Sequence, residues 1–301
     1  MRHCHGDLHL RNICLVDGAP TLFDAIEFND EIANIDTLYD AAFLIMDLCR
    51  YGLGDIANLA FNRYLEASGD YGGLPAIPLF LACRAAIRAH TLAATAASQP
   101  VGEDRRRLST EAQASLVLAG RFFQAPRARV IAIGGLSGTG KSTIARAVAP
   151  ALDSPPGAIV LRTDVIRKSL AGVAPNVRLP PSAYTPEADV AVYRDLIDRA
   201  RVVARAGRTV ILDAVFARPE QRAVARVVAG DAGIPFTGLW LQAREEVMME
   251  RVEGRQGDAS DARSEIVRLQ LGYDIGQVEW PVVETGGAIA TTLAAVRSRL
   301  I

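Results

Sequence analysis

Three consecutive segments decide the fold: Val130-Ile-Ala-Ile133, Gly135-Leu-Ser-Gly-Thr-Gly-Lys-Ser142 and Thr143-Ile-Ala-Arg-Ala-Val148. The first is a short apolar run that predicts a buried strand, and the third predicts a helix. The second matches the full pattern G-x-x-x-x-G-K-[ST], which requires a strand before it and a helix after it. Its glycines allow successive backbone N–H groups to face a phosphate, and the helix N-terminus adds partial positive charge. Together the segments predict a phosphate-binding loop.

The loop predicts ATP and Mg²⁺ as cofactors. Lys141 is expected to reach the β- and γ-phosphates, and the Ser142 hydroxyl is expected to bind Mg²⁺. Lys141 and Lys168 are the only lysines among 33 basic residues, so a lysine in the loop indicates a specific role. A compact ammonium fits beneath a phosphate in such a loop, whereas a guanidinium does not. The residues expected to contact the nucleotide are Gly135, Ser137, Gly138, Thr139, Gly140, Lys141, Ser142 and Thr143.

The composition limits the class of protein. A chain of 301 residues, half of them apolar, is long enough for about two domains with buried cores. A net charge of −1 without a long basic run argues against a nucleic-acid partner. No apolar run approaches the ~20 residues of a membrane span, and the first residues lack the apolar core of a signal peptide. A cytoplasmic protein with no membrane partner is expected.

The apolar pattern changes at Ala125-Pro126-Arg127, which divides the chain into predicted domains 1–125 and 128–301. The second domain alternates apolar strands with helices, which predicts an α/β fold with a five-stranded parallel sheet flanked by helices. Its expected elements are strands Val130–Ile133, Ala158–Leu161, Thr209–Leu212, Thr237–Leu241 and Val282–Glu284, and helices Pro186–Ala206 and Pro219–Ala232. The first domain is expected to be mostly α-helical, with helices over Asp55–Ala67, Pro78–Ala97 and Glu103–Phe123.

A carboxylate follows the second predicted strand, within Arg162-Thr-Asp164-Val-Ile-Arg167-Lys168. Ligands of open α/β sheets lie beyond the carboxyl ends of the strands. There, Asp164 could accept a proton from a substrate hydroxyl while Arg167 holds an anionic group. Asp164 also suits the N-cap of the next helix, and the two roles are compatible.

Two further features indicate catalysis beyond nucleotide binding. Val210-Ile-Leu-Asp213 is an apolar strand that ends in a carboxylate, which predicts a Mg²⁺ ligand or a substrate contact. Residues 251–262 form a polar segment between two predicted helices. As a lid, this segment would bring Arg251 or Arg255 onto the charge that develops during phosphoryl transfer. The alternative is a solvated connecting loop.

These features resemble the P-loop kinases of small molecules, which include gluconate kinases, the kinase half of polynucleotide kinases and zeta-toxin-like proteins. The resemblance covers residues 128 to about 300 and rests on Gly135–Ser142, Asp164, Arg167, Lys168, Asp213 and the lid ending Ser260-Asp261-Ala262. It implies a P-loop kinase domain that transfers the γ-phosphate of ATP to a hydroxyl of a small-molecule acceptor, with Asp164 as general base or as the residue that orients the hydroxyl. It does not name the acceptor.

A second signature lies near residue 1. His5-Gly-Asp7-Leu-His-Leu-Arg-Asn12 fits a kinase catalytic loop, in which the aspartate accepts the hydroxyl proton and the asparagine binds Mg²⁺. The next residues predict a β-hairpin with an Asp17-Gly18 turn. The segment resembles the aminoglycoside phosphotransferase family, whose loop reads H-G-D-x-x-x-x-N, and this implies a catalytic Asp7 and a metal-binding Asn12. A chance turn is the alternative.

The same resemblance implies a metal-side carboxylate after the hairpin, either Asp24 or Glu27. Asp36 and Asp40 resemble the acidic pair that follows the loop in that family. Only four residues precede His5, and residues 1–130 contain no lysine, so the ATP-binding lobe of the family has no counterpart here. A partial protein-kinase-like lobe is expected. Either the chain is a truncated form of a longer two-kinase fusion, or its first half has lost catalysis.

Three functions are consistent with these patterns. The first is a P-loop kinase of a small molecule. The second is a binding or switch module, in which ATP reshapes the second domain for a partner. The third is an aminoglycoside-like kinase activity in a longer form of the chain. The protein partners to expect are the missing N-terminal lobe or a second copy of the chain.

Overall fold

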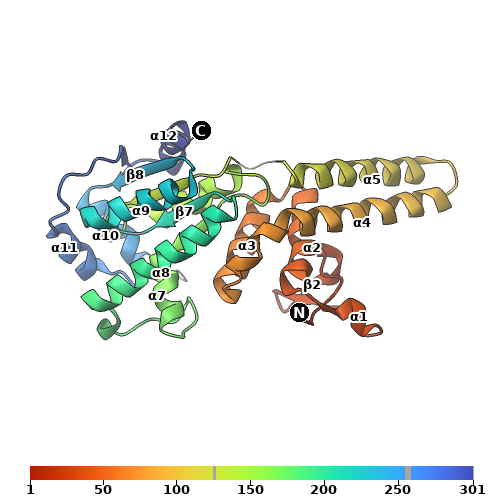
Figure 1. Cartoon of the computed structure of the whole chain (residues 1–301), viewed down its shortest axis with the longest axis horizontal. Helices are drawn as coiled ribbons and strands as arrows, with labels where there is room; N and C mark the ends of the chain where they lie inside the picture. The colour runs from red at the N-terminus through yellow and green to blue at the C-terminus, as the bar shows by residue number, and fades with distance from the viewer. Residues whose placement is uncertain (125–126, 255–258, 301) are drawn as a thin grey trace. The chain divides into compact units, whose positions relative to one another are not determined.

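The structure is a computed structural model that describes residues 1–124, 127–254 and 259–300 (Figure 1). The chain forms two compact units. The first comprises Met1–Pro126 with Ser154–Gly157, and the second comprises Arg127–Asp153 with Ala158–Ile301. Ala125 and Pro126, at the predicted boundary, lie outside the described residues. Each unit is described by itself.

The second unit is built on a parallel sheet of five strands in the order β6-β7-β5-β8-β9. The strands are β5 (Val130–Gly134), β6 (Ile159–Arg162), β7 (Val210–Asp213), β8 (Phe236–Gln242) and β9 (Val282–Glu284). The five-stranded parallel sheet predicted from the sequence is therefore confirmed. β6 and β7 each begin and end one residue later than the strands predicted over Ala158–Leu161 and Thr209–Leu212. β7 ends at Asp213, as its apolar run indicates, and Arg162 pairs with Asp213 across the two strands.

Helices cover both faces of this sheet. Ile131, Ile133 and Ile211 point to one face and pack against α6 (Lys141–Val148) and α12 (Ile289–Leu300). On the other face, α8 (Pro186–Arg205) contacts β6 and β7, and α9 (Pro219–Ala232) contacts β5 and β8. β5, β6 and β7 are buried along their whole length, as expected for a parallel sheet between two layers of helices.

The close approach of Trp280 to β8 requires a glycine at position 238. A Cβ atom at Gly238 would lie 2.4 Å from Trp280, whose ring also packs edge-on against Phe216. No such atom fits without moving the indole. The glycine therefore gives Trp280 its place over the sheet.

Replacing Gly238 with alanine is expected to lower the free energy of unfolding by about 1–3 kcal/mol, because the indole must shift. Gly230 in α9 is the matched control, since a Cβ there meets nothing within 4 Å. Gly230→Ala should raise the free energy of unfolding by roughly 0.5–1 kcal/mol, because alanine is the better helix former. Urea denaturation of both variants measures the two values, and equal effects would contradict the packing described for Trp280.

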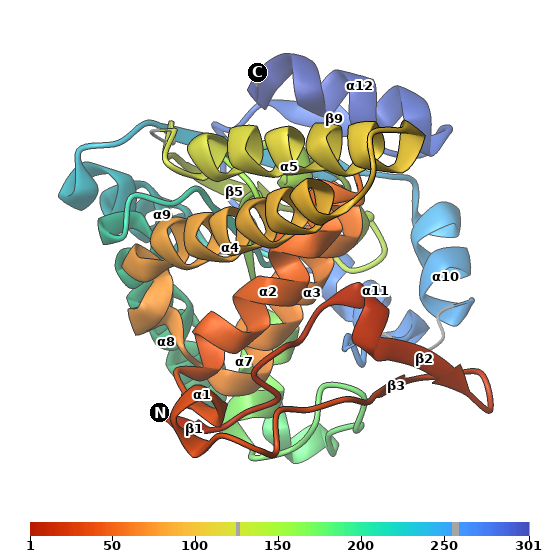
Figure 2. The ribbon, with the colours of Figure 1, turned by 90° about the vertical axis from the view of Figure 1, so that its right-hand side faces the viewer.

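The first unit is mostly helical and carries a β-hairpin, as predicted. The hairpin joins β2 (Ile13–Val16) and β3 (Ala19–Leu22) through Asp17 and Gly18. Two short strands, β1 (Arg2–His3) and β4 (Asn34–Ile35), pair beside α1 (Asp30–Ala33). The larger helices are α2 (Thr37–Arg50), α3 (Gly54–Ser68), α4 (Ile77–Ser98) and α5 (Glu103–Phe122). α4 and α5 lie side by side as a long helical hairpin (Figures 1 and 2).

One helix is longer and more apolar than the sequence-based expectation about membrane spans allows, whereas the expectation of no membrane partner stays a prediction. The helical stretch Tyr71–Ser98, which includes α4, is long and apolar enough to span a membrane by length and composition. Its apolar character is not obvious in the sequence because alanines, rather than large aliphatic residues, supply much of it. Core helices of water-soluble proteins meet the same criterion, so the finding does not assign a location.

Candidate functional site

The glycine loop between β5 and α6 has the backbone conformation that its sequence requires. Gly138 and Gly140 have φ angles of +87° and +88°, a region that side chains with a Cβ rarely adopt. A Cβ at Gly138 would also lie 2.5 Å from the carbonyl oxygen of Met248 in α10 (Glu245–Glu253). The loop is therefore shaped by its glycines and closely packed against α10.

Lys141 is the first residue of α6 and lies over this loop. Its Nζ donates a hydrogen bond to the Leu136 carbonyl at 2.9 Å. The Thr139 hydroxyl donates to the same carbonyl at 2.8 Å, and the Ser137 N–H donates to Gln270 Oε1 at 2.7 Å. Gln270, a buried residue of α11 (Ser264–Leu271), was not found by sequence analysis because its contact with the loop spans 133 residues.

The predicted metal ligands Ser142 and Asp213 are brought together by a residue that the sequence analysis did not select. Arg162 donates from Nη2 to Ser142 Oγ at 3.2 Å and from Nε to Asp213 Oδ2 at 3.3 Å. Arg162 and Asp213 are 3% and 4% exposed, so this ion pair is buried beneath the loop. The sequence does give one indication of the role of Arg162, because a charged residue at the end of an otherwise apolar strand is unusual.

A hydroxyl and a carboxylate are oxygen donors of the kind that Mg²⁺ prefers beside phosphate oxygens, so the residues fit the ion in chemistry. Arg162 holds both oxygen donors in the structure. The Ser142 hydroxyl has two lone pairs and Arg162 occupies one of them, so the other is left for an ion.

Asp164 lies in the first turn of α7 (Thr163–Leu170), directly after β6. Burial raises the pKa of its carboxyl, and the charge of Asp213 adds to this, while Arg162, Lys141 and a hydrogen bond from Ser260 oppose it. The N-cap of α7 is Arg162 and makes no side-chain cap bond, so the N-cap role considered for Asp164 is wrong. The carboxylate instead lies in the field of the loop lysine and of Arg162.

Arg167 and Lys168 are both engaged with neighbouring elements. Arg167 donates to Asp189 of α8 at 2.5 Å and to the carbonyl of Ala183 at 3.1 Å. Lys168, 1% exposed, donates to the Pro175 carbonyl at 3.0 Å and to Asp261 at 3.1 Å. An anionic substrate at Arg167 would therefore compete with Asp189.

Asp261 closes a network that fixes the end of the predicted lid. Besides Lys168, it accepts hydrogen bonds from the Leu179 N–H at 3.1 Å and from the Tyr184 hydroxyl at 2.7 Å. Burial alone would raise the pKa of Asp261, but the hydrogen bonds from Tyr184, Leu179 and Lys168 together lower it. The sequence analysis quoted Asp261 only as the end of the lid, because its partners lie far away along the chain.

Arg251 belongs to helix α10 rather than to a connecting segment, which corrects the start of the lid predicted over residues 251–262. Its guanidinium donates to the Thr285 carbonyl at 2.5 Å and to the Gly138 carbonyl at 3.4 Å. The Thr285 hydroxyl donates in turn to the Thr139 carbonyl at 2.9 Å. Arg251 therefore ties the end of β9 to the glycine loop. Arg255, the second predicted lid arginine, lies outside the described residues.

A cavity of about 350 Å³ opens beside the glycine loop. The loop residues Gly138, Thr139, Gly140 and Ser142 line it, together with Arg251 and with residues after β9 that include Thr285 and Ile289. Its mixture of backbone groups, a cation and an aliphatic wall is typical of small-molecule sites.

In the first unit, the predicted loop residues Asp7 and Asn12 are in contact. The Asn12 amide donates to Asp7 Oδ2 at 3.3 Å and to the Asp7 carbonyl at 3.0 Å. Asp40 accepts hydrogen bonds from the N–H groups of His5 and Gly6 at 3.1 and 3.0 Å, and so holds the loop. Asp24 has a φ angle of +60° and is exposed, as is Glu27.

Among residues 1–124, 127–254 and 259–300, no group of three or more His, Cys, Asp or Glu side chains is placed to hold a metal ion. A metal at either predicted site would therefore need ligand oxygens in addition to the predicted residues, which are Ser142 and Asp213 in the second unit and Asn12 and Asp24 in the first.

The loop, its strand and its helix define a P-loop domain, and residues 130–273 match the family model described as "AAA domain". "Uncharacterized protein Rv2004c" of Mycobacterium tuberculosis (strain ATCC 25618 / H37Rv) is 34% identical over 299 residues, which are 98% of this chain and 57% of that protein. The chain thus spans little more than half the length of this relative.

Two kinases show partial similarity. The "Adenylyl-sulfate kinase" of Myxococcus xanthus (strain DK1622) is 35% identical over 118 residues, 39% of this chain and 59% of that enzyme. The solved structure of the Mycobacterium tuberculosis APS kinase CysC in complex with AMPPNP and APS covers 58% of this chain and 98% of its own, with 23% identity and a TM-score of 0.44. The similarity of the first unit to aminoglycoside phosphotransferases stays a prediction.

Proposed function

We propose that the second unit is an ATP-dependent kinase that transfers the γ-phosphate to a hydroxyl of a small molecule. The observation that carries this proposal is Asp164: a carboxylate with a raised pKa, at the carboxyl end of β6, in the field of Lys141 and Arg162. A nucleotide-binding module needs the loop and its lysine but has no use for a buried base beside them. The partial similarity to an adenylyl-sulfate kinase supports the same class.

The proposed mechanism assigns one task to each side chain. Lys141 leaves the Leu136 carbonyl and holds the β- and γ-phosphates against the loop N–H groups. Ser142 and Asp213 would hold Mg²⁺, which neutralises phosphate charge when bound. Arg162 stays beneath the loop as a positioning residue for Asp213. Asp164 accepts the proton of the acceptor hydroxyl as the oxygen attacks the γ-phosphorus in line, while the bond from that phosphorus to the β,γ-bridging oxygen breaks and ADP leaves.

The cavity beside the loop is proposed to hold the base and ribose of ATP, since the loop residues Gly138, Thr139, Gly140 and Ser142 line it. Arg251 then positions the nucleotide instead of neutralising charge at the reacting phosphate. Arg251→Ala is expected to raise the KM for ATP about 10-fold with a smaller change in kcat.

The matched control for this prediction is Arg244→Ala, because Arg244 is exposed and precedes the same helix. Steady-state kinetics with varied ATP separate KM from kcat. A fall in kcat at unchanged KM would instead support the charge-neutralising role predicted from the sequence for Arg251.

The acceptor is to be found by measuring ADP formation over a panel of sugars, nucleosides, adenylyl sulfate and aminoglycosides. The proposal expects one class to raise ADP formation well above the rate with water. Slow hydrolysis that no acceptor changes would favour the switch module instead. The Leu136 bond of Lys141 supports that alternative, because the ammonium must leave this carbonyl before it can hold the phosphates.

A second candidate activity concerns the first unit in a longer form of the chain. The contact between Asp7 and Asn12, and the hydrogen bonds of Asp40 to the loop, support a phosphotransferase-like lobe that acts with an additional ATP-binding lobe. A cytoplasmic location, where ATP is abundant, belongs to both proposals.

A further inference from the structure

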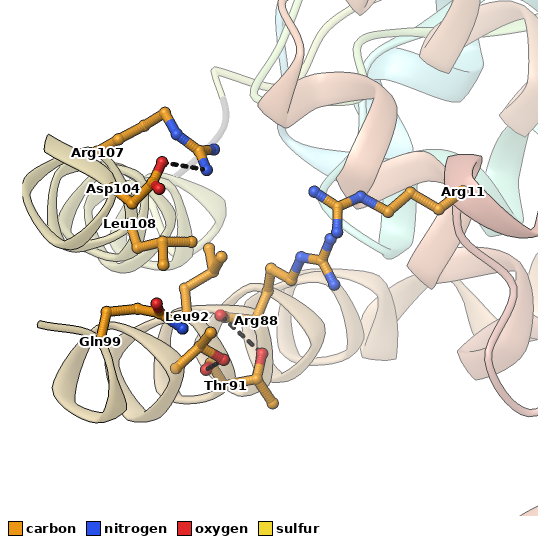
Figure 3. A pocket seen from close by; sticks show the side chains of 9 residues that line it. Arg11, Arg88, Thr91, Leu92, Gln99, Asp104, Arg107 and Leu108 are labelled. Atoms are coloured by element: carbon orange, nitrogen blue, oxygen red, sulfur yellow. Dashed lines mark hydrogen bonds and ion pairs between the residues drawn. The ribbon is translucent and has the colours of Figure 1, made fainter.

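A second cavity lies wholly within the first unit, between the end of the His5–Asn12 loop and the α4–α5 hairpin. Its volume is about 410 Å³ (Figure 3). Three arginines line it, Arg11 from the loop, Arg88 from α4 and Arg107 from α5, and Asp104 is the only carboxylate in its lining. Leu92 and Leu108 add an apolar wall. The lining therefore carries an excess of two positive charges.

Arg88 is the residue whose surroundings best indicate a bound anion. Its Nε and Nη2 atoms are buried and make no hydrogen bond to any of the residues described for this chain. Buried guanidinium nitrogens without acceptors are costly, and an anion, a water or another acceptor beside them removes that cost. Burial and the charges of Arg50 and Arg11 lower the pKa of Arg88, although Asp47 opposes them.

The nearby buried carboxylate of Asp47 already accepts hydrogen bonds from other groups. Asp47 accepts from Arg50 Nε at 2.9 Å through one oxygen and from the Leu10 N–H at 3.1 Å through the other. Figure 3 shows the Arg11 guanidinium turned toward that of Arg88. Two guanidinium groups that face each other repel unless an anion lies between or beside them.

Arg107 differs from the other two arginines because it has acceptors. It is paired with Asp104 at 3.5 Å and with Glu111 at 3.1 Å, and it is 57% exposed at the mouth of the cavity. Arg11 and Arg88 are therefore the two cations that remain for a ligand in this part of the structure. Their planar forks match the oxygens of a phosphate group.

We propose that this cavity is a binding site for a small phosphomonoester, whose phosphate lies on Arg11 and Arg88 and whose organic part lies against Leu92 and Leu108. The excess of two charges matches the dianion, and the volume suits a small metabolite. The site is separate from the glycine loop and does not depend on the function proposed for the second unit.

Isothermal titration calorimetry with glycerol 3-phosphate tests this site, with ionic strength held constant by sodium chloride. The protein carries Lys141→Ala, which weakens phosphate binding at the glycine loop. Saturable binding with one site per chain is expected. Arg11→Met and Arg88→Met should each raise Kd by about 10- to 100-fold, because each removes charged hydrogen bonds to the phosphate.

Arg11 is exposed, so Arg11→Met keeps the proposal testable if Arg88→Met fails to fold. Arg105→Met is the matched control, because Arg105 is an exposed arginine of α5 outside the cavity, and its Kd should not change. Equal Kd values in Arg11→Met and in the parent protein would overturn the proposal. So would malonate binding as tightly as glycerol 3-phosphate, since the site would then not distinguish a phosphate from a dicarboxylate.

Discussion

Replacing Lys141 with alanine is expected to reduce ATP-dependent phosphoryl transfer by about 10³-fold or more and to weaken nucleotide binding. The lysine lies over the loop, 2.9 Å from the Leu136 carbonyl, and the other lysine of the chain is buried with Asp261. No second lysine side chain can therefore bind the β- and γ-phosphates in place of Lys141. Without its charge the transition state is not neutralised, and the rate of transfer falls accordingly. A coupled assay of ADP formation and titration with a fluorescent ATP analogue measure the two effects.

The matched control is Arg194→Ala, which removes an exposed cation of α8 and should leave both measurements unchanged. Circular dichroism must show the same helix content in both variants. If Lys141→Ala keeps normal turnover, the glycine loop is not where the donor phosphate is held.

Asp164→Asn is expected to reduce transfer by about 10²- to 10⁴-fold while nucleotide affinity stays near that of the parent protein. The amide cannot accept the proton of the acceptor hydroxyl, whereas Lys141 and the loop N–H groups remain. The same substitution should raise the thermal stability at neutral pH. Kinetics, nucleotide titration and differential scanning calorimetry follow the three quantities.

The stability effect follows from the raised pKa of Asp164, which means that the folded protein binds this proton more tightly than the unfolded chain. The contribution to stability is present in full below the unfolded-state pKa and is lost as the pH rises through the folded-state pKa. At neutral pH the buried carboxylate is therefore unfavourable, and its neutral amide relieves this. The gain in Tm should shrink as the pH is lowered into the acid range.

The control for Asp164 is Asp198→Asn in α8, whose carboxylate is 59% exposed and pairs with Arg201 at the surface. It should change neither transfer nor its pH dependence. The parent enzyme should lose transfer as the pH falls through the raised pKa of Asp164, because protonation removes the base. Unchanged transfer in Asp164→Asn would show that another group takes the proton.

The sheet and the loop could be predicted because both are local properties of the sequence. A parallel strand buried on two faces is a short apolar run, and a glycine loop is recognised from eight consecutive residues. The helix bounds depend on local breakers such as Pro219 and Gly233, and the helix predicted over Pro219–Ala232 has those bounds in the structure.

The site residues that escaped prediction are those whose partners come from the topology. Arg162 meets Asp213 because β6 and β7 are neighbours in register, and strand order cannot be deduced from apolar runs. Lys168 meets Asp261 across 93 residues for the same reason. Arg251 was expected in a lid because its surroundings in the sequence are polar. In the structure it belongs to α10, which is stabilised by the packing of Met248 and Val252 in a small separate core.

The cavity of the first unit could not be predicted from the sequence for the same reason. Arg11, Arg88 and Arg107 are three ordinary arginines in a sequence that uses arginine almost everywhere. Only the packing of α4 and α5 beside the loop places them around one space, and only burial without acceptors distinguishes Arg88 from a surface cation.

The most direct test of the central claim is mass spectrometry of an acceptor panel incubated with ATP, Mg²⁺ and either the parent protein, Lys141→Ala or Asp164→Asn. The account predicts one acceptor class that gains a single phosphate with the parent protein and with neither variant. A phosphorylated product that forms equally with Asp164→Asn, or ATP hydrolysis with no phosphorylated acceptor in any sample, would contradict it.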